Sequence, residues 1–105
     1  IMDAVAYVDE NYANPDISVK AVADSLGISE GHLSHLFRKE TDSTLMTFVT
    51  KKRMRAAMTL LQDYRHKVYE VAEEVGYRNI TYFSATFKKY VGVSPSEYQD
   101  RYSPE

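Results

Sequence analysis

The chain contains one short motif twice, and this internal repeat limits its fold more than any other feature. The motif is VADSLGIS at residues 22–29 and VAEEVGYR at residues 71–78, forty-nine positions apart in 105 residues. Each copy has an alanine four residues before a glycine, Gly27 or Gly76. Glycine adopts a positive φ at little cost, so a helix that ends there can turn tightly. Each copy therefore predicts a helix, a tight turn and a second helix.

The repeat continues beyond the turn at an offset of fifty residues. The matched residues are Leu33, Ser34, Phe37, Lys39 and Phe48 in the first copy, and Phe83, Ser84, Phe87, Lys89 and Tyr98 in the second. One alanine–glycine match would have little weight, because both residues are common. Two matches followed by the same phenylalanine and basic residue indicate a true duplication. The spacing is that of a helix-turn-helix, whose second helix enters the major groove of DNA.

Helical periodicity extends through nearly the whole chain, and strand patterns are negligible. The first apolar stripe begins at Ile1 and stops before Asn14-Pro15, because proline disfavours helix in the residue before it. Further helices are predicted over 19–26, from a Ser29 cap to about Glu40, and over 45–62, 68–75 and 79–91, with a last helix that begins at the SPSE capping box of residues 94–97. We therefore predict an all-α fold of about seven helices.

The predicted organisation is two helix-turn-helix subdomains joined by a long rigid helix. The first subdomain covers residues 1–44, the linker helix 45–62 and the second subdomain 63–105. The linker segment contains no proline or glycine and would be about 27 Å long as a helix. This length is compatible with two DNA-contacting helices about one DNA turn, roughly 34 Å, apart.

Composition excludes several classes of protein. Cysteine is absent, which excludes disulfides and thiolate metal sites. No apolar run approaches the roughly 18 residues of a membrane span, and no signal peptide is evident, so we expect a cytoplasmic protein without a membrane partner. The net charge is −2, but local net charges are −4 over residues 1–24, +3 over 29–55 and +2 over 76–102. DNA interacts with the charge of the face that is presented to it, so the total net charge does not exclude a nucleic-acid partner.

The stretch RMRAAMTLLQDYRHKVYEVAEEVGYRNITYFSATFKKYVGVSPSEYQ resembles the DNA-binding domain of AraC-type transcription regulators. The resemblance extends over essentially the whole chain, and YFSATFKKYVGVSPSEY is its most specific part. It implies sequence-specific binding of double-stranded DNA, with two recognition helices in successive major grooves on one face. It also implies a larger regulator with an effector or phosphoacceptor domain, RNA polymerase as a candidate partner, and no cofactor. Because Ile1 lies in a predicted helix without an initiator methionine, we expect the chain to be a fragment.

The resemblance implies base-contacting positions on the second helix of each unit. They are Gly31, Ser34 and His35 in the first unit, and Ile80, Thr81, Ser84 and Ala85 in the second. His35 can donate to guanine and Ser34 can serve either base type, whereas Ile80 and Ala85 offer only apolar contact to thymine methyls. Gly31 and Ala85 depart from the family, which often has larger side chains at these two positions.

A second set of residues is expected to contact the DNA backbone. It comprises Ser29, Arg38, Lys39, Arg53, Arg78, Asn79, Lys88 and Lys89. For Arg53, a structural salt bridge between the subdomains is an equal alternative. Solvated side chains are expected at Lys51, Lys52 and Arg55.

Two other functions remain to be weighed. An enzyme is not favoured, because there is no glycine-rich phosphate loop, no cysteine nucleophile and no suitably placed carboxylate pair. His32 and His35 lack a third ligand nearby, so we expect no metal site. Nine tyrosines leave a helical protein-interaction module or an RNA binder as the alternative. Four of them fall at helical core spacing, however: Tyr7, Tyr12, Tyr77 and Tyr98.

Overall fold

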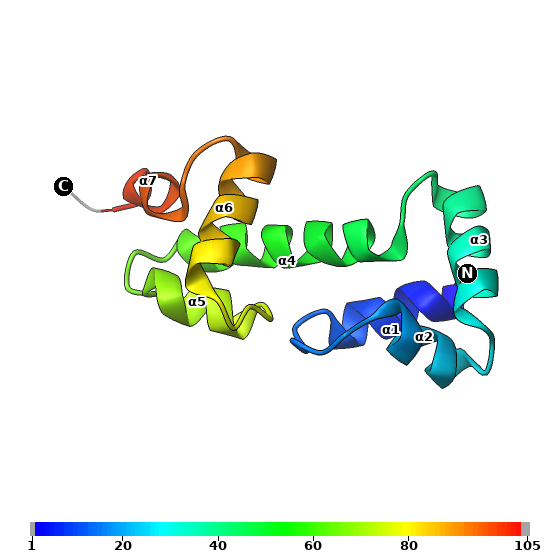
Figure 1. The fold of residues 1–105 in the computed structure, drawn as a ribbon. Coiled ribbons are helices and arrows are strands. Elements are labelled where there is room, and N and C mark those ends of the chain that lie inside the picture. The colour runs from blue at the N-terminus through cyan, green and yellow to red at the C-terminus, as the bar shows by residue number, and fades with distance from the viewer. Residues whose placement is uncertain (1, 104–105) are drawn as a thin grey trace. The chain divides into compact units, whose positions relative to one another are not determined.

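The computed structural model describes residues 2–103, and all regular structure in this range is α-helical (Figure 1). The helices are α1 (Met2–Asn11), α2 (Val19–Leu26), α3 (Glu30–Thr41), α4 (Leu45–Leu61), α5 (Val68–Glu74), α6 (Ile80–Val91) and α7 (Pro95–Asp100). The predicted all-α fold of about seven helices is confirmed. Ile1, which the sequence places in the first apolar stripe, lies outside the described residues. None of the described helices is long and apolar enough to cross a membrane.

The chain divides into two compact units, and the boundary lies inside α4, between Lys52 and Arg53. Unit 1 contains α1, α2, α3 and the first part of α4. Unit 2 contains the rest of α4 with α5, α6 and α7. The limits 1–44, 45–62 and 63–105 stay a prediction, and residues of the middle segment enter both cores.

Each unit has its own apolar core, built from matching positions of the repeat. The buried core of unit 1 is Ala4, Val8, Ile17, Val22, Ala23, Leu33, Phe37, Leu45 and Val49. The buried core of unit 2 is Met54, Ala57, Leu61, Val71, Ala72, Val75, Tyr77, Phe83, Phe87 and Tyr98. Burying one large apolar side chain contributes about 1.5–3 kcal/mol. These contacts fix how the two helices of each helix-turn-helix pack together.

The turns between the paired helices share one hydrogen-bond pattern. In unit 1, Gly27 N–H donates to the Asp24 carbonyl at 3.2 Å and Ile28 N–H to the Ala23 carbonyl at 3.1 Å. In unit 2, the corresponding amides of residues 76 and 77 donate to the carbonyls of residues 73 and 72 at 3.2 and 2.9 Å. The glycines have φ of +70° and +107°, so the predicted left-handed turns are confirmed.

An aromatic pair is also duplicated: it joins α3 to the first turn of α4 in unit 1, and α6 to the first turn of α7 in unit 2. Phe37 and Phe48 meet edge to face with ring centres 5.5 Å apart, and Phe87 and Tyr98 do so at 5.6 Å. Such pairs contribute about 0.5–1.5 kcal/mol beyond the burial of their area. The first part of α4 is therefore the counterpart of α7.

Side-chain hydrogen bonds hold the last helix at its start and near its end. The Ser94 hydroxyl accepts from Glu97 N–H, and Ser94 N–H donates to the Glu97 carboxylate, both at 3.2 Å. This confirms the predicted capping box, and hydrogen bonding to Ser94 holds the pKa of Glu97 below its usual value. Gln99 donates to the carbonyls of Asp63 and His66 at 3.2 and 2.7 Å. α7 thus fixes the loop between α4 and α5.

Substitution of Gly27, in the turn between α2 and α3, should destabilise the fold. Gly27→Val places a β-branched residue at a φ of +70°, which costs about 1–3 kcal/mol although space for the side chain is open. Chemical denaturation followed by circular dichroism measures the loss. As a control, Gly31→Ala lies inside α3 with open space around it and should not destabilise. An unchanged stability of Gly27→Val would contradict the role given to the turn.

Candidate nucleic-acid interface

Helix α3 buries one side in unit 1 and leaves the other in solvent. Leu33 and Phe37 are buried, whereas Gly31, Ser34 and His35 are exposed. The division follows from the helical period, which places residues three and four apart on one face. The predicted base-contacting side of α3 is thus open to a partner, and contact with bases stays a prediction.

The side-chain cap at the start of each recognition helix occupies only part of its polar group. Ser29 Oγ accepts from His32 N–H at 3.1 Å, and Asn79 Oδ1 accepts from Tyr82 N–H at 3.0 Å. The serine hydroxyl hydrogen and the asparagine amide group can still donate. The first turn of a helix also attracts anions through its exposed N–H groups. Both caps are therefore compatible with the predicted contacts to DNA phosphates.

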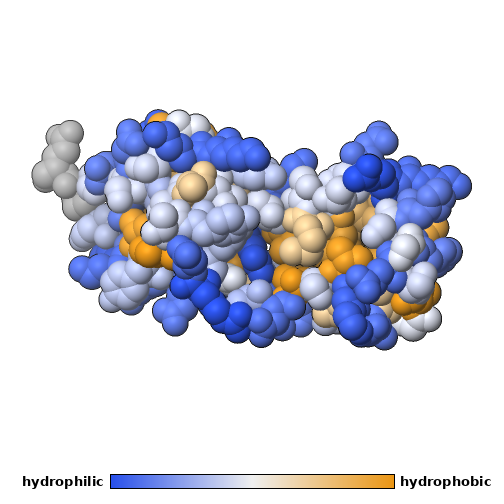
Figure 2. All heavy atoms as spheres, viewed as in Figure 1, coloured by the Kyte–Doolittle hydropathy of each residue, from blue (hydrophilic) through white to orange (hydrophobic). Residues whose placement is uncertain are grey.

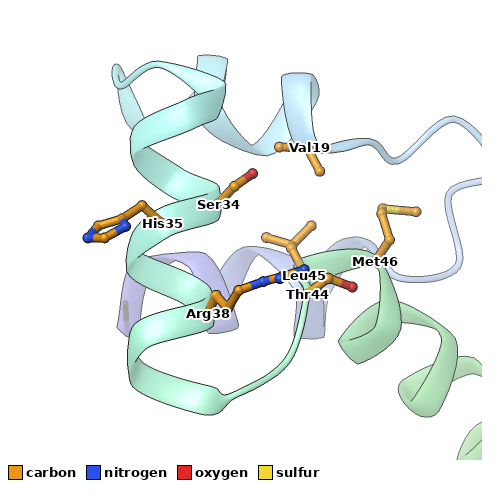
Figure 3. Close-up of a pocket in the computed structure, with 7 residues that line it drawn as sticks. All are labelled: Val19, Ser34, His35, Arg38, Thr44, Leu45 and Met46. Carbon is orange, nitrogen blue, oxygen red and sulfur yellow. The ribbon is translucent and has the colours of Figure 1, made fainter.

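A hollow of about 390 Å³ lies beside α3 (Figure 3). It is lined by Val19, Ser34, His35, Arg38, Thr44, Leu45 and Met46. Ser34 and Arg38 extend from α3 toward the other lining residues, whereas His35 extends to the other side of the helix in this view. Figure 2 shows apolar side chains gathered on unit 1 near the start of α4. The hollow is thus lined by polar groups of α3 on one side and by the apolar residues Val19, Leu45 and Met46 on the other.

Four residues that line this hollow are absent from the predicted site: Val19 of α2, Thr44 just before α4, and Leu45 and Met46 of α4. Thr44 could have been found from the repeat, because the offset of fifty places it opposite Ser94. Its hydroxyl caps α4 by accepting from Thr47 N–H at 3.1 Å. Val19 and Met46 carry no such signal, since an apolar residue at a helix start gives no indication of a surface hollow.

The predicted phosphate-contacting cations at the helix ends are exposed. They are Arg38 and Lys39 in the last turn of α3, and Lys88 and Lys89 in the last turn of α6. Within residues 2–103, none of the four forms an ion pair, unlike Lys20, Lys52 and Arg65, which pair with Asp24, Asp9 and Asp63. Their charges are consequently available to an anionic partner.

Arg38 also borders a second, polar hollow of about 620 Å³. The other residues lining it are Thr41, Asp42, Ser43, Thr44, Thr47 and Lys51. The two cations and the Thr47 hydroxyl are donors that suit a phosphate oxygen. The hydroxyls of Thr41, Ser43 and Thr44 already donate within the chain. Lys51, expected to be solvated, is exposed at this hollow.

Helix α6 repeats the arrangement with different outward side chains. Phe83 and Phe87 are fully buried. Ile80, Thr81 and Ala85 are exposed, and Ile80 retains 43% of its accessible surface. The remaining predicted residue of this face, at position 84, is half-buried. An isoleucine this exposed at the start of a helix can offer an apolar contact to a partner.

A hollow of about 370 Å³ lies beside the turn before α6. It is lined by Tyr69, Ala72, Glu73, Tyr77, Arg78 and Ile80. Of the predicted DNA-contacting residues, only Arg78 and Ile80 border it. Tyr69, which is 58% exposed, has no counterpart among the predicted residues and lies outside the repeated turn.

The two histidines of α3 are both exposed. Within the described part of the chain, no group of three or more His, Cys, Asp or Glu side chains is placed to hold a metal ion. An exposed imidazole can donate to guanine N7 or O6. His35 therefore stays a predicted base contact.

Arg53 differs from the other predicted backbone contacts because it is buried. It retains 8% of its accessible surface and is the one buried charged residue of residues 2–103. Its guanidinium carbon lies 4.9 Å from the centre of the Tyr77 ring in unit 2. Contact of Arg53 with DNA stays a prediction, and the burial gives its side chain a packing role.

Comparison with known proteins places these features in a family. A family model described as a helix-turn-helix domain matches residues 22–101. The arabinose operon regulatory protein of Salmonella typhimurium is 32% identical over 99 residues, which are 94% of this chain and 35% of that protein. The chain thus spans about a third of the length of this relative.

Solved structures agree with this match. The C-terminal domain of AraT, a response regulator from Geobacillus stearothermophilus, has a TM-score of 0.92 at 33% identity, covering 97% of this chain and 84% of that one. The DNA-binding domain of AdpA, a global transcriptional factor solved in complex with a target DNA, has a TM-score of 0.88 at 26% identity, covering 96% and 90%. The chain belongs to the AraC-type (AraC/XylS) family of helix-turn-helix transcription regulators.

Proposed function

We propose that this chain binds double-stranded DNA sequence-specifically, with α3 and α6 in successive major grooves. The observation that supports this most is the same surface pattern in both units. In each, an exposed face of the second helix is followed in its last turn by two cations without ion pairs. Bases are contacted in the groove, while cations and helix starts hold the phosphates. The DNA complex of the related AdpA domain adds support by analogy.

The chain acts in this proposal as the DNA-binding part of a larger transcription regulator. Its relative in the arabinose operon is about three times as long, and AraT is a response regulator. An effector or phosphoacceptor domain would control the DNA-binding part, and RNA polymerase would be its further partner in the cytoplasm. The relatives named above are regulators of transcription, and we assign no catalytic activity to the chain.

Footprinting on a duplex obtained by selection from random sequences tests this function. We expect one monomer to protect two major grooves on one face of the DNA, because the duplicated helix-turn-helix lies in a single chain. A matched RNA should bind more weakly, since A-form helices close the major groove to a recognition helix. A footprint limited to one groove, a need for dimerisation, or preference for RNA would contradict the proposal.

Affinity should fall steeply with salt, with a log–log slope of about −0.9 for each phosphate contacted. Arg38→Ala and Lys88→Ala should each weaken binding to all sequences alike and reduce this slope by about one. Arg65→Ala is the control, because Arg65 pairs with Asp63 and lies outside the proposed interface. Titrations at several salt concentrations measure the slopes. Weakening at one sequence only would show that these two cations do not contact phosphates.

The two half-sites should contribute unequally to specificity. Helix α3 offers Ser34 and His35, which can form hydrogen bonds with base edges. The corresponding face of α6 has only short polar groups beside Ile80 and Ala85. A good base contact provides about 1–3 kcal/mol of discrimination, so the α3 half-site should contain more sequence information. Selection from random duplexes measures both half-sites together.

Two substitutions should shift this balance in opposite directions. His35→Ala should relax specificity at one or two base pairs of the α3 half-site. Ala85→Arg should create a new preference, for guanine, in the α6 half-site, because arginine pairs with guanine O6 and N7. Equal information in both half-sites, or an unchanged preference in Ala85→Arg, would contradict the asymmetry and leave DNA binding itself intact.

A further inference from the structure

The side chain of Arg53 packs against the turn that precedes α6. An ideal Cβ at Gly76 would lie 2.9 Å from Arg53 Nε and 3.0 Å from its Cζ and Nη2. The guanidinium carbon is also 4.9 Å from the centre of the Tyr77 ring. Arg53 thus contacts Gly76 and Tyr77 in the turn between α5 and α6, and Gly76 is buried.

The matching turn of unit 1 has no such support. Gly27 is exposed, and a Cβ there would meet nothing within 4 Å. The offset of forty-nine places Ala4 at the position of Arg53, and Ala4 is 1% exposed. One unit therefore has a methyl group where the other has a guanidinium.

The two turns also differ in length. Two residues, Gly27 and Ile28, lie between Leu26 and the Ser29 cap, whereas residues 76–78 lie between Val75 and the Asn79 cap. The longer turn belongs to the unit with the arginine. A longer turn loses more conformational entropy when it is fixed in one conformation. It therefore needs more contacts to hold the following helix in one orientation.

We propose that Arg53 is a positioning residue for the second recognition helix: its guanidinium packs between Gly76 and Tyr77 and fixes the longer turn, and with it the direction of α6. It acts on DNA binding through α6 and not through a phosphate. The inference rests on the proposed contact of α6 with a second half-site.

The chemistry of the guanidinium suits this position. A guanidinium is planar and stacks on aromatic rings. A buried charge is costly unless its nitrogens are hydrogen-bonded. Within residues 2–103, no fully buried side-chain nitrogen or oxygen lacks a hydrogen-bond partner. A lysine would keep the charge and lose the flat group that fits beside a glycine.

Amide hydrogen exchange on the whole chain tests the contact without DNA. Arg53→Met and Arg53→Lys should both accelerate exchange in residues 76–84, with the first turn of α3 unchanged. Arg55→Met is the matched control, because Arg55 lies two residues along the same helix and is exposed. Unchanged exchange in residues 76–84 for both Arg53 variants would overturn the inference.

Binding to duplexes altered in one half-site tests the consequence for recognition. In both Arg53 variants, discrimination at the α6 half-site should fall about tenfold, comparable to the loss of one base contact. Discrimination at the α3 half-site and the salt slope should stay as in the wild type. A slope reduced by about one, with both half-sites weakened alike, would identify Arg53 as a phosphate contact. An Arg53→Lys variant that binds DNA like the wild type would also identify Arg53 as a phosphate contact.

A double-mutant cycle provides a second measurement in case a variant unfolds. Gly76→Ala should lower the midpoint of thermal unfolding more than Gly27→Ala, because only the first meets the guanidinium. In an Arg53→Ala background, the effect of Gly76→Ala should shrink and that of Gly27→Ala should stay the same. Equal effects of Gly76→Ala in both backgrounds would overturn the inference.

Failure of the proposed function would be distinguishable from failure of this inference. A wild-type protein that selects no α6 half-site would contradict the proposed two-groove binding. Hydrogen exchange and the double-mutant cycle would then decide on their own whether Arg53 positions α6.

Discussion

Both units depend on one backbone constraint, a residue with positive φ between the two helices of each helix-turn-helix. Gly27 directly follows α2 and Gly76 lies two residues after the end of α5, both with positive φ. The amides of each glycine and of the residue after it donate to carbonyls of the preceding helix. The reversal brings Leu33 and Phe83 into the two cores. Because one side of each recognition helix is buried in this way, the opposite side must face solvent. The exposed face is thus a consequence of the turn.

Local chemistry explains why much of the fold could be predicted from the sequence. A serine before a helix, a glycine after one and the SPSE box act within a few residues, so their effects do not depend on distant parts of the chain. Ser29, Gly27 and Ser94 accordingly have the predicted roles. Helical periodicity also explains which residues of α3 and α6 are buried together, since the period decides which apolar residues share one side of a helix.

Side chains whose partners lie far away in the sequence could not be predicted in this way. Lys52 was expected to be solvated, but its ammonium group lies 2.7 Å from Asp9 and 5.5 Å from the centre of the Phe48 ring. Arg53, the next residue, turns its side chain into unit 2. Two adjacent cations on one helix thus contact residues of different units. The packing of the other helices determines which unit each contacts, and the hollows beside α3 and α6 arise from the same packing.

The duplication also separates the scaffold from the contacts that a partner would make. Core positions keep apolar residues in both copies, and the cations at the ends of the recognition helices, Arg38 and Lys88, keep their charge. Of the positions predicted to meet bases, Ser34 and Ser84 match, whereas Gly31 stands opposite Thr81 and His35 opposite Ala85. Phosphates are alike along DNA, so both units can use the same chemistry for them, whereas bases differ between two half-sites. Repeated cations and divergent outward residues are the pattern expected of two copies of one scaffold that contact different base pairs.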